Sequence, residues 1–288
     1  MVQFKNDGKT ALTKDGVKIY YEVDGSLERE AIFIIPGVGG SEEIYNNIAD
    51  RLKEEFCIIK IDGRGIGLSD KPEGMYTIAD MTWDIDAVLN DLKIEAAHLL
   101  GHSLGGFVAQ EYYNRFPSRV KSLILVSTNA CYGDSHAVLA STQAINIINK
   151  KIEPQDPRLP ELILEKSLVI YHKNFVFSEE GQRKIMEILE ISKERVQYEH
   201  MVKRGYGGWQ YKNFDNLKEI KVPTLIIQGA DDQLAPAANA KIFAEEIPGC
   251  EVKILEECGH LPFVEKEEEF INLLRKFLAI KVSPALFA

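Results

Sequence analysis

The sequence predicts an α/β fold in which a mostly parallel sheet carries helices on both faces. From residue 31 onward, short apolar runs alternate with longer stretches of helical periodicity, a rhythm typical of parallel strands joined by helices. Of the 288 residues 45% are hydrophobic, as in an ordinary globular protein. A chain of this length buries about three quarters of its unfolded surface, which favours one large domain with an insertion over two equal domains.

The first expected element is an antiparallel strand pair. Apolar and polar residues alternate from Lys9 to Gly25 on both sides of Asp15-Gly16, a dipeptide that favours a two-residue hairpin turn with positive φ. Six further strands are expected at Ala31–Ile35, Cys57–Ile61, His98–Leu100, Ser122–Val126, Thr224–Ile227 and Val252–Leu255. Between them apolar residues recur every three or four positions, as in Ile44, Ile48 and Leu52, so each helix has one buried stripe.

A mostly helical insertion interrupts this rhythm at residues 131–214. Helical patterns such as Leu159 to Tyr171 and Glu180 to Arg195 follow one another there without a strand-like run. The alternation of strand and helix resumes after it. The sequence therefore predicts a core domain formed by residues 1–130 and 215–288, with the insertion as a subdomain.

Charge and composition exclude several classes of partner. The net charge of −10 repels phosphate backbones and anionic lipid, and no block of five Lys or Arg interrupts it, so neither nucleic acid nor a membrane surface is expected as a partner. No segment approaches the roughly 18 apolar residues that span a bilayer, and we expect a cytoplasmic protein. The cysteines form no C-x-x-C pair and are expected to be reduced core thiols: Cys57, Cys131, Cys250 and Cys258.

The strongest chemical signal is the sequence G-H-S-L-G at residues 101–105. It follows an expected strand and opens a helical pattern from Phe107 to Phe116. A serine on such a turn is held in a strained backbone conformation, and glycines two residues away on either side let neighbouring segments approach closely. Although G-x-S-x-G also occurs in ordinary glycine-rich turns, its placement between strand and helix identifies Ser103 as a candidate nucleophile.

A serine nucleophile needs an imidazole base that is itself oriented by a carboxylate. Two later loops offer these groups, each just beyond the carboxyl end of an expected strand, where open α/β sheets place their sites. The first loop holds Asp231 and Asp232, and the second holds His260. The remaining imidazoles are interpreted as structural or surface groups, with His102 packed under the serine turn: His98, His102, His136, His172 and His200.

Together these motifs resemble the α/β-hydrolase superfamily over nearly the whole chain. The chain order serine, acid, histidine is the order of that superfamily. The resemblance implies a triad of Ser103, Asp232 and His260, because Asp232 rather than Asp231 matches the acid in G-x-x-D-x-x-x-P and His260 matches the base in G-H-x-P. The sequence D-G-R-G-I-G-L-S at residues 62–69 also matches a motif of the superfamily, and we expect it to be structural.

The resemblance also implies an oxyanion hole made of backbone amides. One donor is the N–H of Leu104, directly after the nucleophile, and the other is the N–H of Val38 in the sequence P-G-V-G-G-S at residues 36–41. Many relatives have His-Gly where this chain has Pro36-Gly37, so a side-chain hydrogen bond is lost while the Val38 amide is kept. The loop does not match the dinucleotide pattern G-x-G-x-x-G. Neither a metal ion nor an organic cofactor is expected.

In this superfamily the insertion after the sixth strand forms a cap over the nucleophile, and the lining of the cap selects the substrate. Residues 131–214 are therefore expected to be the cap. Its aromatic residues indicate an apolar or mixed pocket rather than a site for a polyanion. The candidate substrate-binding residues are Trp209, Tyr206 and His136, followed by Tyr211, Phe175 and Phe177.

The first functional hypothesis is a serine carboxylesterase that acts on a small or medium apolar ester, with no expectation of oligomeric state. Haloalkane dehalogenases and epoxide hydrolases resemble this fold but have Asp at the position of Ser103. Carbon-carbon hydrolases of aromatic degradation often have Trp at the position where this chain has Leu261. Proline iminopeptidases usually show G-G-S-W-G-G around the nucleophile, whereas this chain has G-H-S-L-G-G at residues 101–106. An enol-lactonase or carbon-carbon hydrolase is the alternative within the enzyme class. A ligand-binding receptor on the same fold is the alternative of another class.

Overall fold

A computed structural model describes residues 8–132, 135–151, 153 and 155–282. In these residues the chain forms an eight-stranded sheet with the order β1-β2-β4-β3-β5-β6-β7-β8. The strands are β1 (Lys9–Leu12), β2 (Lys18–Asp24), β3 (Ala31–Ile35), β4 (Cys57–Ile61), β5 (Ala97–His102), β6 (Val120–Val126), β7 (Thr224–Gly229) and β8 (Glu251–Leu255). β1 and β2 pair antiparallel, as do β2 and β4, and the other neighbours are parallel. The predicted mostly parallel sheet is confirmed.

The predicted hairpin forms, but its turn differs from the expectation. The N–H of Thr13 donates to the carbonyl of Val17 at 2.9 Å, so the loop between the paired residues has three members rather than two. Gly16, the last of them, has a φ of +84°. A three-residue loop that ends in a left-handed glycine is a common hairpin closure, and Asp15 therefore keeps a negative φ.

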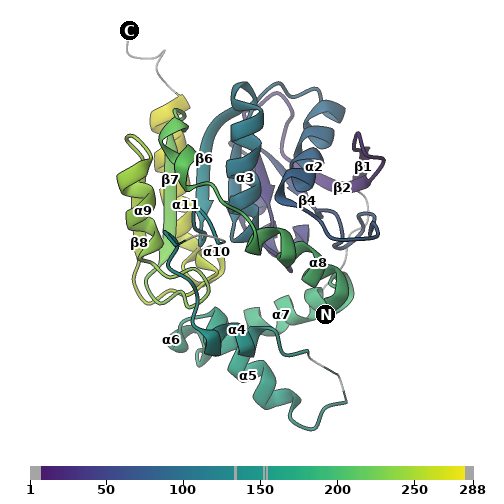
Figure 1. The fold of residues 1–288 in the computed structure, drawn as a ribbon, viewed down its shortest axis with the longest axis vertical. Coiled ribbons are helices and arrows are strands. Elements are labelled where there is room, and N and C mark those ends of the chain that lie inside the picture. Colours follow the sequence, from purple (N-terminus) through teal and green to yellow (C-terminus); the bar gives the residue numbers. More distant parts are fainter. Residues whose placement is uncertain (1–7, 133–134, 152, 154, 283–288) are drawn as a thin grey trace.

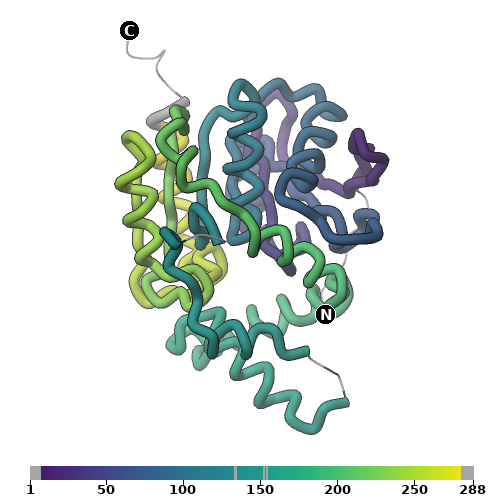
Figure 2. Tube along the Cα trace, viewed as in Figure 1, coloured from purple at the N-terminus to yellow at the C-terminus, as the bar shows by residue number. Residues whose placement is uncertain are grey.

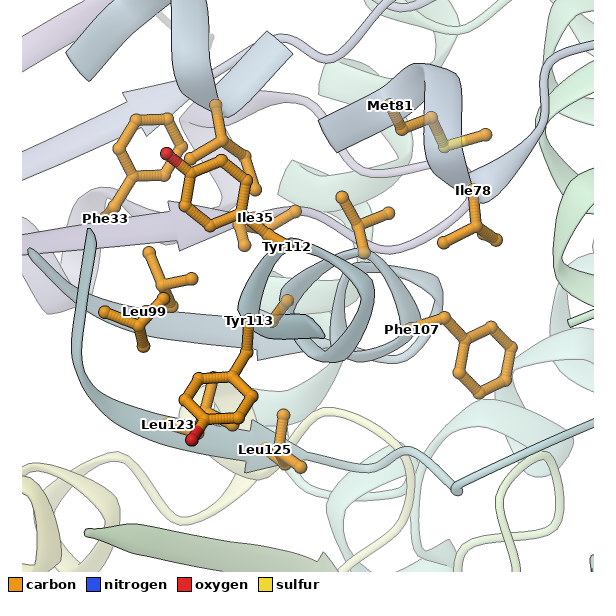
Figure 3. Packing of buried hydrophobic residues seen from close by; sticks show 14 of the residues in the cluster. Phe33, Ile35, Ile78, Met81, Leu99, Phe107, Tyr112, Tyr113, Leu123 and Leu125 are labelled. Atoms are coloured by element: carbon orange, nitrogen blue, oxygen red, sulfur yellow. The ribbon is translucent and has the colours of Figure 1, made fainter. Parts of the chain in front are cut away.

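Two layers of helices cover the sheet (Figure 1). Helices α2 (Ile78–Asp91), α3 (Leu104–Arg115) and α9 (Asn239–Glu246) bury their apolar residues on one face, whereas α1 (Asn46–Leu52) and α11 (Glu267–Val282) cover the other. Side chains of β3 alternate between these faces, Phe33 toward the first and Ile34 toward the second. Figure 3 shows the first face, where α3 lies on the sheet through Tyr112 and Tyr113, whereas Phe107 points away from the strands.

The insertion is helical and lies between β6 and β7. Its helices are α4 (Thr142–Ile148), α5 (Leu159–Ile170), α6 (Lys173–Val176), α7 (Glu179–Arg195) and α8 (Tyr198–Trp209). Figure 2 shows that helices α4 to α7 gather in a lobe below the sheet core, while α8 returns along the edge of the core. The entering and leaving segments meet, because Cys131 and Lys212 form an antiparallel bridge and the N–H of Tyr132 donates to the carbonyl of Tyr211 at 3.0 Å. We use the name cap for residues 131–214.

The four cysteines form no disulfide, as expected; Cys57, Cys131 and Cys258 are buried, whereas Cys250 is half-buried rather than a core residue. Within the described part of the chain, no helix is both long enough and apolar enough to cross a membrane.

Candidate active site

Ser103 lies on the sharp turn between β5 and α3. Its backbone has φ of 53° and ψ of −118°, a combination that non-glycine residues rarely adopt. The turn is held from β6 and the segment after it. The Ser103 N–H donates to the carbonyl of Val126 at 2.9 Å, and its carbonyl accepts from the Thr128 hydroxyl at 2.8 Å. The strained conformation is therefore fixed by hydrogen bonds on both sides of the serine.

The glycines around the turn are required by close backbone contacts. A Cβ at Gly105 would overlap the carbonyl oxygen of Ile35, and a Cβ at Gly101 would overlap the carbonyl oxygen of Gly105. Any side chain at either position would push α3 away from β3 or from the turn itself. The structure thus confirms that these glycines serve close approach.

Asp232 and His260 lie together in the structure. His260 Nδ1 and Asp232 Oδ2 are 2.8 Å apart, and both side chains are nearly inaccessible to solvent. The other carboxylate oxygen of Asp232 accepts from the backbone N–H groups of Leu234 at 2.8 Å and Ala235 at 2.9 Å. Asp231 is exposed. A carboxylate fixed in this way orients the imidazole and leaves Nε2 available for a proton transfer.

His102 is a buried link between the loops of the site. Its Nδ1 lies 3.1 Å from the Tyr45 hydroxyl, and its Nε2 lies 2.9 Å from the carbonyl oxygen of His260. Because a carbonyl only accepts, this network places the proton on Nε2 and lets Nδ1 accept from Tyr45. Burial and the neighbouring His260 lower the pKa of His102 to about 3, so the ring is neutral. The expected structural role under the serine turn is confirmed.

The loop after β3 lies against the nucleophile. A Cβ built on Gly37 would be 3.3 Å from the Cβ of Ser103, so the next peptide borders the serine. Within the described residues, no hydrogen bond takes up the N–H of Val38 or that of Leu104, the first residue of α3. Two free donors therefore flank the serine, as an oxyanion site requires.

The structure places the six aromatic candidates of the cap in different surroundings. Tyr206 and Trp209 are 40% and 47% exposed, and Phe177 is 64% exposed. His136 is exposed and stacks on Phe214 with ring centroids 3.8 Å apart. Tyr211 is buried against Phe107, and Phe175 packs on Tyr171. Their contact with a substrate stays a prediction.

The face of α8 that meets the site consists of residues that the sequence analysis did not single out. Met201 lies beside Gly39, Gly205 beside Val38 and Gly208 beside Leu104. Residues 201, 204, 205 and 208 lie on one face of the helix, because they are three or four positions apart. This spacing, rather than an aromatic side chain, is the sequence signal that could have identified them. Tyr206 and Trp209 lie outside this set.

The segment 62–69 supports the oxyanion loop. The carboxylate of Asp62 accepts from the N–H of Glu42 at 3.0 Å and from that of Leu68 at 2.8 Å. Burial raises the pKa of this carboxyl to about 6. Arg64 forms a buried ion pair with Asp84, with 2.8 Å between Nη2 and Oδ1. The expected structural role of this motif is confirmed.

An acidic cavity of about 360 Å³ lies beyond this loop, between the core and α7. The buried Lys60 ammonium is there within ion-pair distance of Glu22, Asp24 and Glu42. Burial raises the pKa of Glu42 to about 8. In the described ranges, no group of three or more His, Cys, Asp or Glu side chains is arranged to hold a metal ion.

A family model described as the alpha/beta hydrolase fold matches residues 30–170 and 171–267 of the chain. The match covers most of the sequence and includes the turn at Ser103 and the loops of Asp232 and His260. The chain therefore belongs to the α/β-hydrolase family and is a hydrolase by its class.

Relatives within this family differ in the bond that they cleave. The chain is 28% identical over 295 residues to a proline iminopeptidase of Lactobacillus helveticus, covering 91% of this chain and 95% of that enzyme. It is 27% identical over 268 residues to a 2-hydroxy-6-oxononadienedioate/2-hydroxy-6-oxononatrienedioate hydrolase of Paraburkholderia phymatum, covering 91% of both. An esterase from Exiguobacterium antarcticum superimposes with a TM-score of 0.81 at 26% identity, over 96% of this chain and 100% of that one.

Proposed function

We propose that this protein is a serine hydrolase that cleaves a carboxylic ester of a small or medium apolar substrate through an acyl-enzyme. The observation that carries the proposal is the 2.8 Å contact between His260 Nδ1 and Asp232 Oδ2 beside the strained turn of Ser103. A nucleophile, a base and a group that orients the base are thus supplied by three separate loops at one edge of the sheet.

In the proposed reaction the Ser103 hydroxyl oxygen attacks the ester carbonyl carbon while its proton passes to His260 Nε2. The negative charge that forms on the carbonyl oxygen is held by the N–H groups of Val38 and Leu104. Asp232 stabilises the imidazolium and remains ionised. His260 then gives its proton to the leaving alkoxide, an acyl-serine remains, and a water activated by His260 releases the acid.

An ester is favoured as the substrate by the esterase of Exiguobacterium antarcticum, whose fold this chain shares over nearly its full length. The second candidate is cleavage of an enol-lactone or a carbon-carbon bond, and the Paraburkholderia phymatum relative supports it. Leu261 follows the histidine where carbon-carbon hydrolases often have Trp, which favours the ester. A non-catalytic receptor of the same fold is disfavoured, because the strained conformation of Ser103 costs stability that ligand binding alone does not require.

The test is the release of nitrophenol from acyl esters of increasing chain length at pH 7 to 8, together with labelling by a fluorophosphonate probe. Ser103→Ala should abolish both without changing thermal unfolding. Ser118→Ala, at an exposed position beyond the opposite end of α3 from the turn, is the matched control and should behave as wild type.

Three outcomes separate the candidates. Fast turnover that depends on Ser103 supports the esterase. Labelling without ester turnover, followed by turnover of lactones, ring-cleavage dienones or a proline arylamide, would assign the chain to one of the other hydrolase classes. Full ester turnover by Ser103→Ala would overturn the nucleophile.

A further inference from the structure

Arg204 of α8 is a buried cation that contacts the oxyanion loop. It is 2% exposed, and its side chain donates three hydrogen bonds that all end on backbone carbonyls. Nε donates to the carbonyl of Val38 at 3.2 Å, Nη2 to that of Gly37 at 3.3 Å, and Nη1 to that of Arg64 at 2.9 Å. Arg204 thus joins the cap by hydrogen bonds to the loop beside the nucleophile.

The surroundings of this guanidinium are not those of an ordinary buried ion pair. Among the described residues, no carboxylate lies within 4.0 Å of its nitrogens; Asp84 and Asp62 act on it only from farther away. Burial lowers the pKa of Arg204 from its ordinary value, but a guanidinium remains charged. The chain also leaves space for the group, because a Cβ on Gly63 would overlap Nη1.

The contact with Gly37 acts directly on the peptide that carries the Val38 oxyanion donor. The carbonyl of Gly37 and the N–H of Val38 belong to one planar trans peptide, in which the two groups point in opposite directions. A donor fixed on this carbonyl therefore fixes the direction of the N–H on the other side. The Gly40 N–H also donates to the same oxygen, at 3.3 Å, so the peptide is held from two sides.

We propose that Arg204 is a positioning residue of the oxyanion site, which aims and polarises the Gly37–Val38 peptide from the side opposite the substrate. The proposal rests on the proposed function, in which the Val38 N–H binds the oxyanion. A charged donor on a carbonyl withdraws electrons from the amide and strengthens its N–H as a donor, most of all when negative charge develops in front of it. The cap therefore takes part in the chemical step as well as covering the site.

A merely structural Arg204 would hold the cap on the core and nothing more. Arg195 offers the matched comparison, because it is also a nearly buried cap arginine and pairs with Glu43 of the core. Among the hydrogen bonds of the described residues, none joins Arg195 to the carbonyl of Gly37 or of Val38. Loss of either arginine weakens the attachment of the cap, but only loss of Arg204 alters the oxyanion peptide.

The experiment compares Arg204→Met, Arg204→Lys and Arg195→Met with wild type, by ester turnover and by the rate of fluorophosphonate labelling of Ser103. For Arg204→Met we expect kcat to fall on the order of 10- to 100-fold, less than the roughly 10²- to 10³-fold for a deleted donor, with KM within about threefold. Labelling should slow in parallel. Arg195→Met should keep kcat within about threefold at a reduced melting temperature, and Arg204→Lys should be intermediate. Guanidinium ion should restore part of the rate of Arg204→Ala.

The outcomes keep this proposal apart from the proposed function. If wild type is labelled but hydrolyses no ester, the substrate class is wrong and the labelling rates still test Arg204. Equal labelling rates for wild type and Arg204→Met would overturn the positioning role, as would an equal loss of kcat in Arg195→Met. If Arg204→Met does not fold, Arg204→Lys decides: a rate equal to wild type overturns the proposal.

Discussion

Strand β3 in the sheet core and helix α7 in the cap bury very different shares of their length. All five residues of β3 are buried, because helices cover both faces of the sheet. The 17 residues of α7 include four buried ones, Gly181, Ile185, Ile191 and Arg195. The core thus buries apolar side chains on both faces of its sheet, whereas a cap helix such as α7 buries only one narrow stripe of side chains. The position of the cap over the core must depend on additional contacts.

Those contacts are polar, and several of them end on the loops of the site. The N–H of His260 donates to the carbonyl of Ile170 at the end of α5, at 2.6 Å. Glu265 accepts from the N–H of Gly259 at 3.0 Å and from the N–H of His172 in the cap at 2.7 Å. Together with Arg204 at the oxyanion loop, these bonds attach the cap both to the loop of His260 and to the loop beside the nucleophile.

The largest effect that we expect lies in the core. Asp232→Asn should lower kcat by about 10⁴-fold, because an amide no longer holds His260 in the required tautomer, while the fold is retained. Asp231→Asn is the matched control and should leave kcat unchanged, since Asp231 is exposed. Steady-state turnover with a nitrophenyl ester measures both. A comparable loss in the two variants would remove the distinction between the adjacent aspartates.

The second prediction contrasts a buried pair of the core with an exposed pair of the cap. Asp84→Ala should destabilise the protein by about 3–5 kcal/mol, because it leaves the buried Arg64 guanidinium with a weaker set of partners. Glu187→Ala, which removes an exposed pair with Arg183 at 3.6 Å, should cost less than about 0.5 kcal/mol. Urea unfolding measures both changes. Similar losses would mean that the cap relies on its surface pairs as much as the core relies on this buried one.

The third and smallest prediction concerns the junction between core and cap. Burial raises the pKa of Glu265 to about 7, above the ordinary value of 4.5. The folded protein therefore binds this proton more tightly than the unfolded chain. The contribution of the protonated Glu265 to the stability of the fold is full below pH 4.5 and is lost as the pH rises through 7. Through this group the free energy of unfolding changes by at most about 1.4 kcal/mol per pH unit.

Glu265→Gln should remove that slope from urea unfolding measured between pH 5 and 7.5. Asp62 and Glu42, whose pKa values are also raised, contribute slopes of the same sign to both proteins, so the difference between wild type and variant is the quantity to compare. A variant whose stability varies with pH just as wild type does would show that Glu265 stays ionised throughout.

The sequence predicted the core well because burial on two faces leaves continuous apolar runs. The exceptions lie where polar side chains extend a strand: β5 ends at His102 rather than at Leu100, and β8 begins at Glu251 rather than at Val252. The order of Ser103, the acid and His260 was visible for a related reason, since each follows a strand that the pattern identifies.

The cap contacts could not be predicted in the same way. The groups that Arg204 and His260 meet are backbone carbonyls, Gly37 and Ile170 among them, and every residue type carries a carbonyl. Such contacts therefore cannot be recognised from the composition or the hydropathy of the sequence. The aromatic side chains of Tyr206 and Trp209 are visible in the sequence, whereas the face of α8 that meets the loop carries glycines, one methionine and one arginine.

The bridge between Cys131 and Lys212 has a consequence for how such a molecule can change over evolutionary time. The two ends of the cap meet at this bridge, so the entropy of closing the segment between them depends little on its length. A shorter, longer or unrelated segment can therefore be exchanged between these two residues while the strands keep their registers. Such a replacement can change the substrate selectivity of the protein, provided that the new segment again donates hydrogen bonds to the carbonyls of the oxyanion loop.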